Sequence, residues 1–260
     1  MRPNPSLEPL RSGVALSPVG HQPADAEIYS LEFFELQLLF AAKVADLTGL
    51  PLAETVGSHT NIYVRLAMGP RLDGANPAWL EYVAALAHVR DRAALTYEVH
   101  LQRARLPAGP QAAASAGCFS YAPLGPNRVR LHFHPGLQRS DSPLSLVNQH
   151  RRRQELTALL SKIVLLGPDI HVVGASWLYN LNSYRRLFPQ RYLDSLQPIE
   201  PPYQRLPLWG QFLHRDRSVR TVAAQRFRTR LARTAKLAEL GSCFPLPVLS
   251  AAVPAAWLIP

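Results

Sequence analysis

The sequence predicts an α+β protein in which a helical N-terminal half is followed by a mixed β-sheet. Three observations carry this prediction. Apolar residues recur at helical spacing between residues 27 and 106. Residues 107–116 (PAGPQAAASA) then form a linker of small residues and prolines. Beyond the linker the apolar period changes to two, which is typical of strands. We therefore expect a leader over 1–26, a helical domain over 27–106 and an α/β domain over 117–260.

The composition indicates an ordinary globular chain of 260 residues, which is enough for a sizeable core. No uncharged apolar run reaches the roughly 18 residues of a membrane-spanning helix. The first residues also lack the continuous apolar stretch of a secretory signal. Cys118 and Cys243 are too few for a disulfide framework. From these features we expect a cytoplasmic protein.

The elements of the N-terminal half follow from its apolar spacing and its stop signals. Residues 1–26 hold five prolines and no period, which predicts a disordered leader. The next stretch is apolar nearly all round and predicts a buried helix that stops at Gly49. A second helix is predicted from Pro51 to about Gly69. A third is predicted to begin with Asn76 as its cap, and to continue or restart before Pro107.

The second half alternates strands and helices. Residues 118–124 and 128–134 flank Gly-Pro-Asn and predict a β-hairpin. A polar loop (135–145) leads into a long helix (146–166), which precedes a strand apolar on both faces (169–178). The remaining predictions are a short helix interrupted at Pro189 (183–196), a strand (206–213), an amphipathic arginine-rich helix (219–240) and an irregular tail after Cys243.

The polar loop is a candidate anion site because it joins a strand to the start of a helix. Free backbone amides and the helix dipole at such a junction favour a negative group. Gly136 permits close approach of a ligand, and Arg139 offers a guanidinium fork. The remaining partners would be the side chains of Gln138, Ser140, Ser142 and Ser145. The alternative is that Ser142 or Ser145 simply caps the helix.

Two histidines stand two residues apart on one strand face. His132 and His134 could both reach a single metal ion, with His150 or His171 as a third ligand, which would favour a metal-dependent hydrolase. The alternative is a solvated strand face, and we expect no metal. Ser176 lacks the second glycine of a nucleophile elbow, so we do not expect it to be a nucleophile. Cys118 is expected to be a buried, inert cysteine.

Basic charge is concentrated near the end of the chain. The net charge is +10, and residues 214–236 carry seven of these charges. Such a segment could engage nucleic acid or a phosphorylated ligand, so a non-catalytic protein that binds an anionic partner is an alternative function. Phe227 is the segment's one aromatic residue and belongs to its apolar stripe, which favours a solvated basic face over a base-stacking surface.

The predicted elements follow in the order hairpin, polar loop, helix, central strand, short helix, strand. This order resembles the core of the acyl-CoA N-acyltransferase superfamily. More narrowly, the chain is similar over residues 118–213 to bacterial acyltransferase-domain proteins with a helical N-terminal half. The matching motifs are His134-Pro135-Gly136, Ser142-Pro143-Leu144 and Ser176-Trp177-Leu178-Tyr179. The chain departs from the superfamily's Gly-rich pyrophosphate signature, because Arg139 is followed by Ser-Asp-Ser-Pro.

The resemblance implies an N-acyltransferase that uses acyl-CoA as co-substrate and a small-molecule or protein amine as acceptor. The cofactor's phosphates would lie on the loop between the strand and the following helix, with Arg139 and Arg151 assisting. His134 or His171 would be the general base, since neutral imidazole can take a proton from an amine near pH 7. Asp141 could orient that base, and Tyr179 would be the acid for the departing thiolate.

Overall fold

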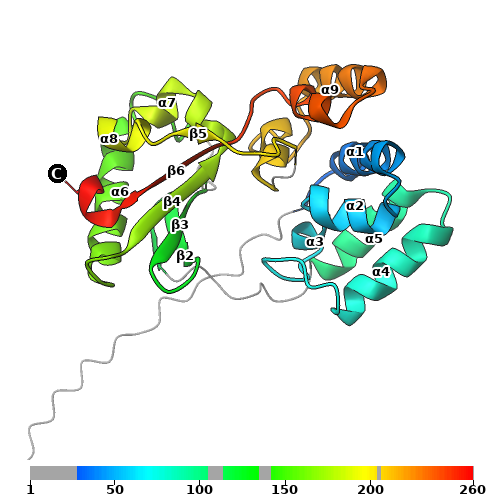
Figure 1. The fold of residues 1–260 in the computed structure, drawn as a ribbon, viewed down its shortest axis with the longest axis horizontal. Helices are drawn as coiled ribbons and strands as arrows, with labels where there is room; N and C mark the ends of the chain where they lie inside the picture. Colours follow the sequence, from blue (N-terminus) through cyan, green and yellow to red (C-terminus); the bar gives the residue numbers. More distant parts are fainter. Residues whose placement is uncertain (1–27, 105–113, 135–141, 204–205, 260) are drawn as a thin grey trace, which may run out of the picture.

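The computed structural model describes residues 28–104, 114–134, 142–203 and 206–259. A helical N-terminal region precedes a six-stranded mixed sheet with helices between its strands, which confirms the α+β class. Figure 1 shows the sheet and its helices as one lobe and the N-terminal helices as a second lobe beside it. The predicted leader and residues 107–113 of the predicted linker lie outside the described residues.

The first helices follow the predicted apolar spacing. Helix α1 (Leu31–Thr48) is buried on most sides and ends at Gly49, whose φ of 73° suits glycine. The predicted second helix is two helices, α2 (Leu52–His59) and α3 (Ile62–Arg65). They separate at Thr60, because its hydroxyl donates to Val56 O and accepts from Ile62 N.

Capping side chains begin the next two helices. Helix α4 (Pro77–His88) starts after Asn76, whose side chain accepts a hydrogen bond from Ala78 N at 3.0 Å, as predicted. Helix α5 (Arg92–Arg103) is the predicted restart, and the Asp91 carboxylate accepts from Ala94 N at 2.9 Å. Among the described residues, no helix is long and apolar enough to cross a membrane.

The sheet has the strand order β1-β2-β3-β4-β6-β5. Strands β2 (Phe119–Pro123) and β3 (Arg128–Phe133) form the predicted hairpin. Strand β3 pairs in parallel with β4 (His171–Ser176), whereas the other neighbouring strands are antiparallel. The outer strands are β1 (Ala114–Ala116), formed by the last residues of the predicted linker, and β5 (Gln197–Pro198).

Helix α6 (Gln149–Val164) makes the crossover between the two parallel strands. Strand β4 ends at Ser176 instead of Leu178, because the Ser176 hydroxyl accepts from Leu178 N and caps a 3-10 turn, η1 (Trp177–Asn180). The predicted helix over 183–196 is two single turns separated at Pro189, α7 (Asn182–Arg185) and α8 (Gln190–Leu193).

Two predictions for the C-terminal region are wrong. The predicted strand over 206–213 is a 3-10 helix, η2 (Leu206–Phe212), whose Leu208, Trp209 and Phe212 are buried in the helical lobe. The predicted irregular tail contains β6 (Leu249–Pro254), which pairs with β4 and β5 and buries Ala251 and Val253. A short turn, η4 (Ala255–Leu258), then packs against α6.

The structure has two hydrophobic cores, and one of them combines segments that are far apart in the sequence. One core lies between the sheet, α6 and the turns η1, α7, α8 and η4. The other joins the N-terminal helices to residues 208–248, which include η2, α9 (Thr221–Arg233) and η3 (Leu237–Cys243). Phe40, Trp209, Phe227 and Phe244 meet in this core with ring centroids 5.2–6.0 Å apart. The segment between β5 and β6 is therefore part of the helical lobe.

Candidate functional site

The candidate site lies where the parallel strands β3 and β4 end. Their register runs from Arg128 opposite His171 to Leu131 opposite Gly174. Both strands then continue for two residues, to Phe133 and Ser176, without a further register pair. On their outer sides the same residues stay paired, with β2 and β6 respectively. The β3–β4 ladder therefore has an opening at its carboxyl end, between residues 132–133 and residues 175–176.

Ser120, His132 and His134 form a polar group beside this opening. Ser120 lies opposite His132 in the β2–β3 register and is buried. The His134 Nε2 is 3.1 Å from the Ser120 hydroxyl, and its ring stacks on that of His132 with centroids 6.1 Å apart. The backbone N–H of His134 donates to Cys118 O at 2.7 Å, which fixes the chain at the end of β3. The His134 residue is exposed, and its bond to Ser120 directs its ring toward β2, the neighbour of β3 on the side away from β4.

Burial of the His132 ring, together with the smaller effects of the neighbouring His134 and Arg130 charges, lowers its pKa to about 4. In an unfolded chain the imidazole pKa is about 6.5. The unfolded chain therefore binds more protons between these two values, and stability is lost as the pH falls from about 6.5 to about 4.

Replacing His132 by glutamine is expected to flatten this part of the pH dependence by roughly 2 kcal/mol, after allowance for the ring's exposed part. Urea denaturation of the wild type and of His132→Gln at pH 7 and pH 4.5 gives the change in unfolding free energy of each protein between the two pH values. Subtracting one change from the other cancels the contribution of the other titrating groups. A His132 ring that titrates near pH 6.5 in nuclear magnetic resonance spectra would contradict the expected burial effect.

A buried ionic corner holds the hairpin against α6. The Glu155 carboxylate accepts from Cys118 N at 2.9 Å and pairs with the guanidinium of Arg152 at 2.9 Å. Arg151 Nε adds a bond of 3.2 Å to the same carboxylate. The Arg152 side chain is buried and also donates to the Cys118 thiol. Burial raises the pKa of that thiol, which agrees with the expected inert cysteine.

Three tyrosines fill the sheet face beneath Gly174. The hydroxyls of Tyr179 and Tyr192 are 2.6 Å apart, and the Tyr184 ring packs against that of Tyr179. Tyr179 is only 1% exposed, and burial raises its pKa well above the usual value. A departing thiolate would have to reach this hydroxyl through the sheet core, and the assignment of Tyr179 as the acid stays a prediction.

The two candidate bases are not close together. His171 opens β4 opposite Arg128, and its Nδ1 lies 3.1 Å from Asp169 O. His134 lies six residues beyond Arg128 on the neighbouring strand, which places it roughly 20 Å away along the sheet. Only His134 is at the carboxyl ends of the strands. Among the described residues, no group of three or more His, Cys, Asp or Glu side chains could hold a metal ion.

The predicted phosphate-binding residues are described only in part. Gly136, Gln138, Arg139, Ser140 and the predicted orienting residue Asp141 lie outside the described residues.

Ser142 and Ser145 lie at the entrance to α6. There the Asn148 side-chain amide donates to Ser142 O at 3.0 Å and to the Ser145 hydroxyl at 3.1 Å. Asn148, not a serine, is the N-cap residue, and its side chain makes no capping bond. Its turn toward the serines leaves the first amides of α6 without a cap from that side chain.

Sequence reasoning missed Ser120 and the ionic corner of Arg152 and Glu155. The alternation of the hairpin strands could have revealed Ser120, because a residue opposite His132 must share its face. The corner joins residues that are distant in sequence, and no local pattern indicates it. Comparison of the chain with known protein families, curated proteins and solved structures found no match.

Proposed function

We propose that the sheet lobe binds an acyl-CoA at the diverging ends of β3 and β4 and transfers its acyl group to an amine. The observation that supports this best is the end of the parallel pairing at Leu131 and Gly174, before either strand has ended. An extended ligand that carries amides, such as a pantetheine arm, can pair with strand backbone in the way an added strand does.

The α6 entrance is suited to the phosphates of the same ligand. The predicted polar loop lies between β3 and α6 in the chain, and the N-cap Asn148 makes no side-chain capping bond. Phosphates of a pantetheine arm bound between the strands would then lie near the N-terminus of α6. Gly136, Gln138, Arg139, Ser140, Ser142 and Ser145 are the proposed phosphate-binding residues. Arg151 is less suited to assist, since it already bonds to Glu155.

His134 is the proposed general base. It follows the carboxyl end of β3, and a hydrogen bond of 3.1 Å to Ser120 on β2 holds its exposed ring. A neutral imidazole can accept the proton of an attacking amine, which frees the nitrogen lone pair for attack on the thioester carbonyl. The acyl–sulfur bond then breaks, and the thiolate takes up the proton that His134 has accepted, which restores the neutral imidazole. His171 is distant from this opening, so we do not propose it as the base.

Acetyl-CoA is expected to raise the thermal midpoint Tm of the full chain by several degrees at 1 mM ligand. For a dissociation constant near 10 μM, mass action stabilises the folded state by about 2.7 kcal/mol. Adenosine 3′,5′-diphosphate is expected to give a smaller shift, because it has no pantetheine arm to occupy the gap. Differential scanning fluorimetry measures both shifts.

The control for nonspecific anion binding is a protein that carries Arg226→Gln and Arg233→Gln on the distant arginine-rich helix. The shift with acetyl-CoA should be unchanged in that variant. The proposal is overturned if 1 mM acetyl-CoA gives no shift, if the two ligands act equally, or if the arginine variant loses the effect.

A further inference from the structure

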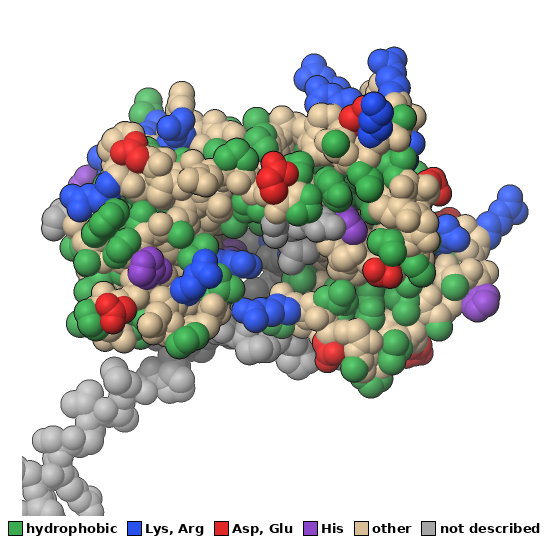
Figure 2. Space-filling view, in the orientation of Figure 1, with side chains coloured by type: hydrophobic (Ala, Val, Ile, Leu, Met, Phe, Trp, Pro, Cys, Tyr) green, Lys and Arg blue, Asp and Glu red, His purple; other side chains and the backbone are tan. Residues whose placement is uncertain are grey.

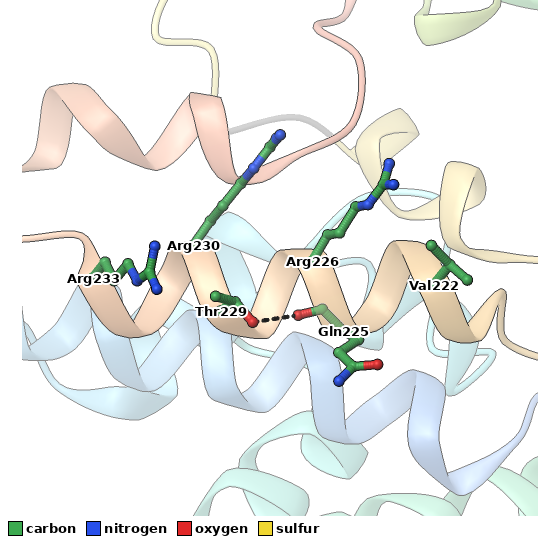
Figure 3. A pocket seen from close by; sticks show the side chains of 6 residues that line it. All are labelled: Val222, Gln225, Arg226, Thr229, Arg230 and Arg233. Atoms are coloured by element: carbon green, nitrogen blue, oxygen red, sulfur yellow. Dashed lines mark hydrogen bonds between the residues drawn. The ribbon is translucent and has the colours of Figure 1, made fainter.

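Helix α9 presents an arginine stripe on the helical lobe. Arg226, Arg230 and Arg233 follow at intervals of four and three residues, which places them on one side of the helix. Figure 3 shows these side chains with Gln225, Thr229 and Val222 around a surface pocket of about 380 Å³. The opposite side of α9 buries Ala224, Phe227 and Leu231, so the helix is held rigidly with its stripe outward. In Figure 2, Lys and Arg side chains project from the region of the surface where α9 lies.

No carboxylate among the described residues forms an ion pair with the three arginines of this stripe. Arg228 lies on another side of the helix and bonds to Glu32 and Glu35 of α1, each at 3.0 Å. Arg226 and Arg233 have no ion pair among the described residues. Arg230 donates to Ser242 O at 3.0 Å, and an uncharged carbonyl leaves its positive charge uncompensated. Helix α9 itself contains no acidic residue.

We propose that this face of α9 binds the phosphate backbone of double-stranded DNA. Guanidinium forks match phosphate oxygens in shape and charge, and the Gln225 side-chain amide can add a neutral hydrogen bond. The Thr229 hydroxyl already donates to Gln225 O at 3.0 Å. The three arginines span seven residues, which is about 10 Å along a helix. A major groove about 12 Å wide accommodates one helix, and phosphates line both of its edges. The concentration of basic charge near α9 would also speed encounter with DNA.

The composition of the face favours duplex DNA over other anionic partners. Protein interfaces are anchored by buried aromatic and large apolar side chains, and here the one apolar lining residue is Val222, which is 65% exposed. Single strands bind by stacking their bases on aromatic rings, and none lines this pocket. What the face does offer is charge and hydrogen bonding, which are the contacts that a phosphate backbone makes.

The test uses the full chain and a fluorescein-labelled mixed-sequence DNA duplex of about 20 base pairs. Anisotropy titrations between 50 and 200 mM salt give the slope of log K against log salt. Three phosphate contacts predict a slope near −2.7, at about 0.9 per phosphate. The double variant Arg226→Gln/Arg233→Gln should bring the slope close to −1. It should also weaken binding at 50 mM salt at least about tenfold.

The matched control is Arg71→Gln/Arg90→Gln, which removes two exposed charges that precede and follow α4 in the sequence. Figure 1 shows α4 apart from α9. This control should leave the slope nearly unchanged. Equal losses in the two double variants would overturn the assignment to α9, as would the absence of wild-type binding at 50 mM salt. Tighter binding to polyglutamate or to a single-stranded oligonucleotide of equal length would overturn the choice of duplex DNA. Because neither double variant alters the strand opening, this result is independent of the acetyl-CoA test.

Discussion

Replacing Gly117 by alanine is expected to lower the free energy of unfolding by about 4 kcal/mol. Gly117 has a φ of +55°, which is unfavourable for any residue with a Cβ atom. An alanine Cβ would also overlap the Glu155 carboxylate. That carboxylate can move only by giving up its bonds to Cys118 N and Arg152, which would leave a buried guanidinium without its counter-ion.

The control is Gly49→Ala, which has a φ of +73° and no atom within 4 Å of the added Cβ. Backbone strain alone then costs about 1 kcal/mol. Urea denaturation of both variants separates the strain from the displacement of Glu155. Glu155→Gln, made alone and together with Gly117→Ala, provides a second check. If the alanine has already displaced the carboxylate from Cys118 N and Arg152, Glu155→Gln should cost less stability in that background than in the wild type. If the effects of Gly117→Ala and Glu155→Gln are additive, the carboxylate is not displaced and the explanation is wrong.

Replacing Gly174 by alanine is expected to cost about 3 kcal/mol, or a fall in Tm on the order of 10 °C. Here the backbone is unstrained, and the cause is lack of space. The added Cβ would overlap the hydroxyls of Tyr179 and Tyr192 and lie 2.8 Å from Tyr179 Cζ. Both rings are packed in the sheet core against Phe188, so neither can turn away.

Removing the two hydroxyls should relieve part of this cost. In a background of Tyr179→Phe and Tyr192→Phe, the same Gly174→Ala change should cost at least about 1 kcal/mol less. Gly210→Ala is the control for adding a methyl group, because its Cβ would meet Trp177 Nε1 at an ordinary 3.5 Å. Thermal unfolding of the set measures the effects. An equal cost of Gly174→Ala in both backgrounds would show that the tyrosine hydroxyls do not set the space limit.

Features set by neighbours in sequence could be predicted. The Asn76 cap, the Gly49 stop, the turn between β2 and β3 and the presence of a helix at α6 depend on residues a few positions apart. Strand β6 could not, because its alternation is carried by small alanines and its partner β4 is distant in sequence. The run 206–212 has the apolar content of a strand, yet the aromatic core of the helical lobe favours a 3-10 helix there.

The sequence could predict the location of the candidate site but not the roles of its residues. The strand–loop–helix order indicated the carboxyl end of β3, and His134 does lie there with Ser120 beside it. The same reasoning could not separate His134 from His171, since strand direction and register decide which end each occupies. The proposed roles of Tyr179 and of the loop residues that lie outside the described ranges stay predictions.

The return of the segment between β5 and β6 to the helical lobe has a consequence for biogenesis. The ribosome synthesises the last residues of the helical core before it synthesises β6. Strand β4 therefore has no partner on its β6 side until the end of synthesis. The nascent sheet thus has an unprotected edge while residues 177–248 are translated, which takes several seconds at typical rates. Neither lobe can be excised as one continuous fragment that leaves the other lobe out. The helical core combines residues before the sheet with residues 208–248, and the sheet core combines residues on both sides of that segment.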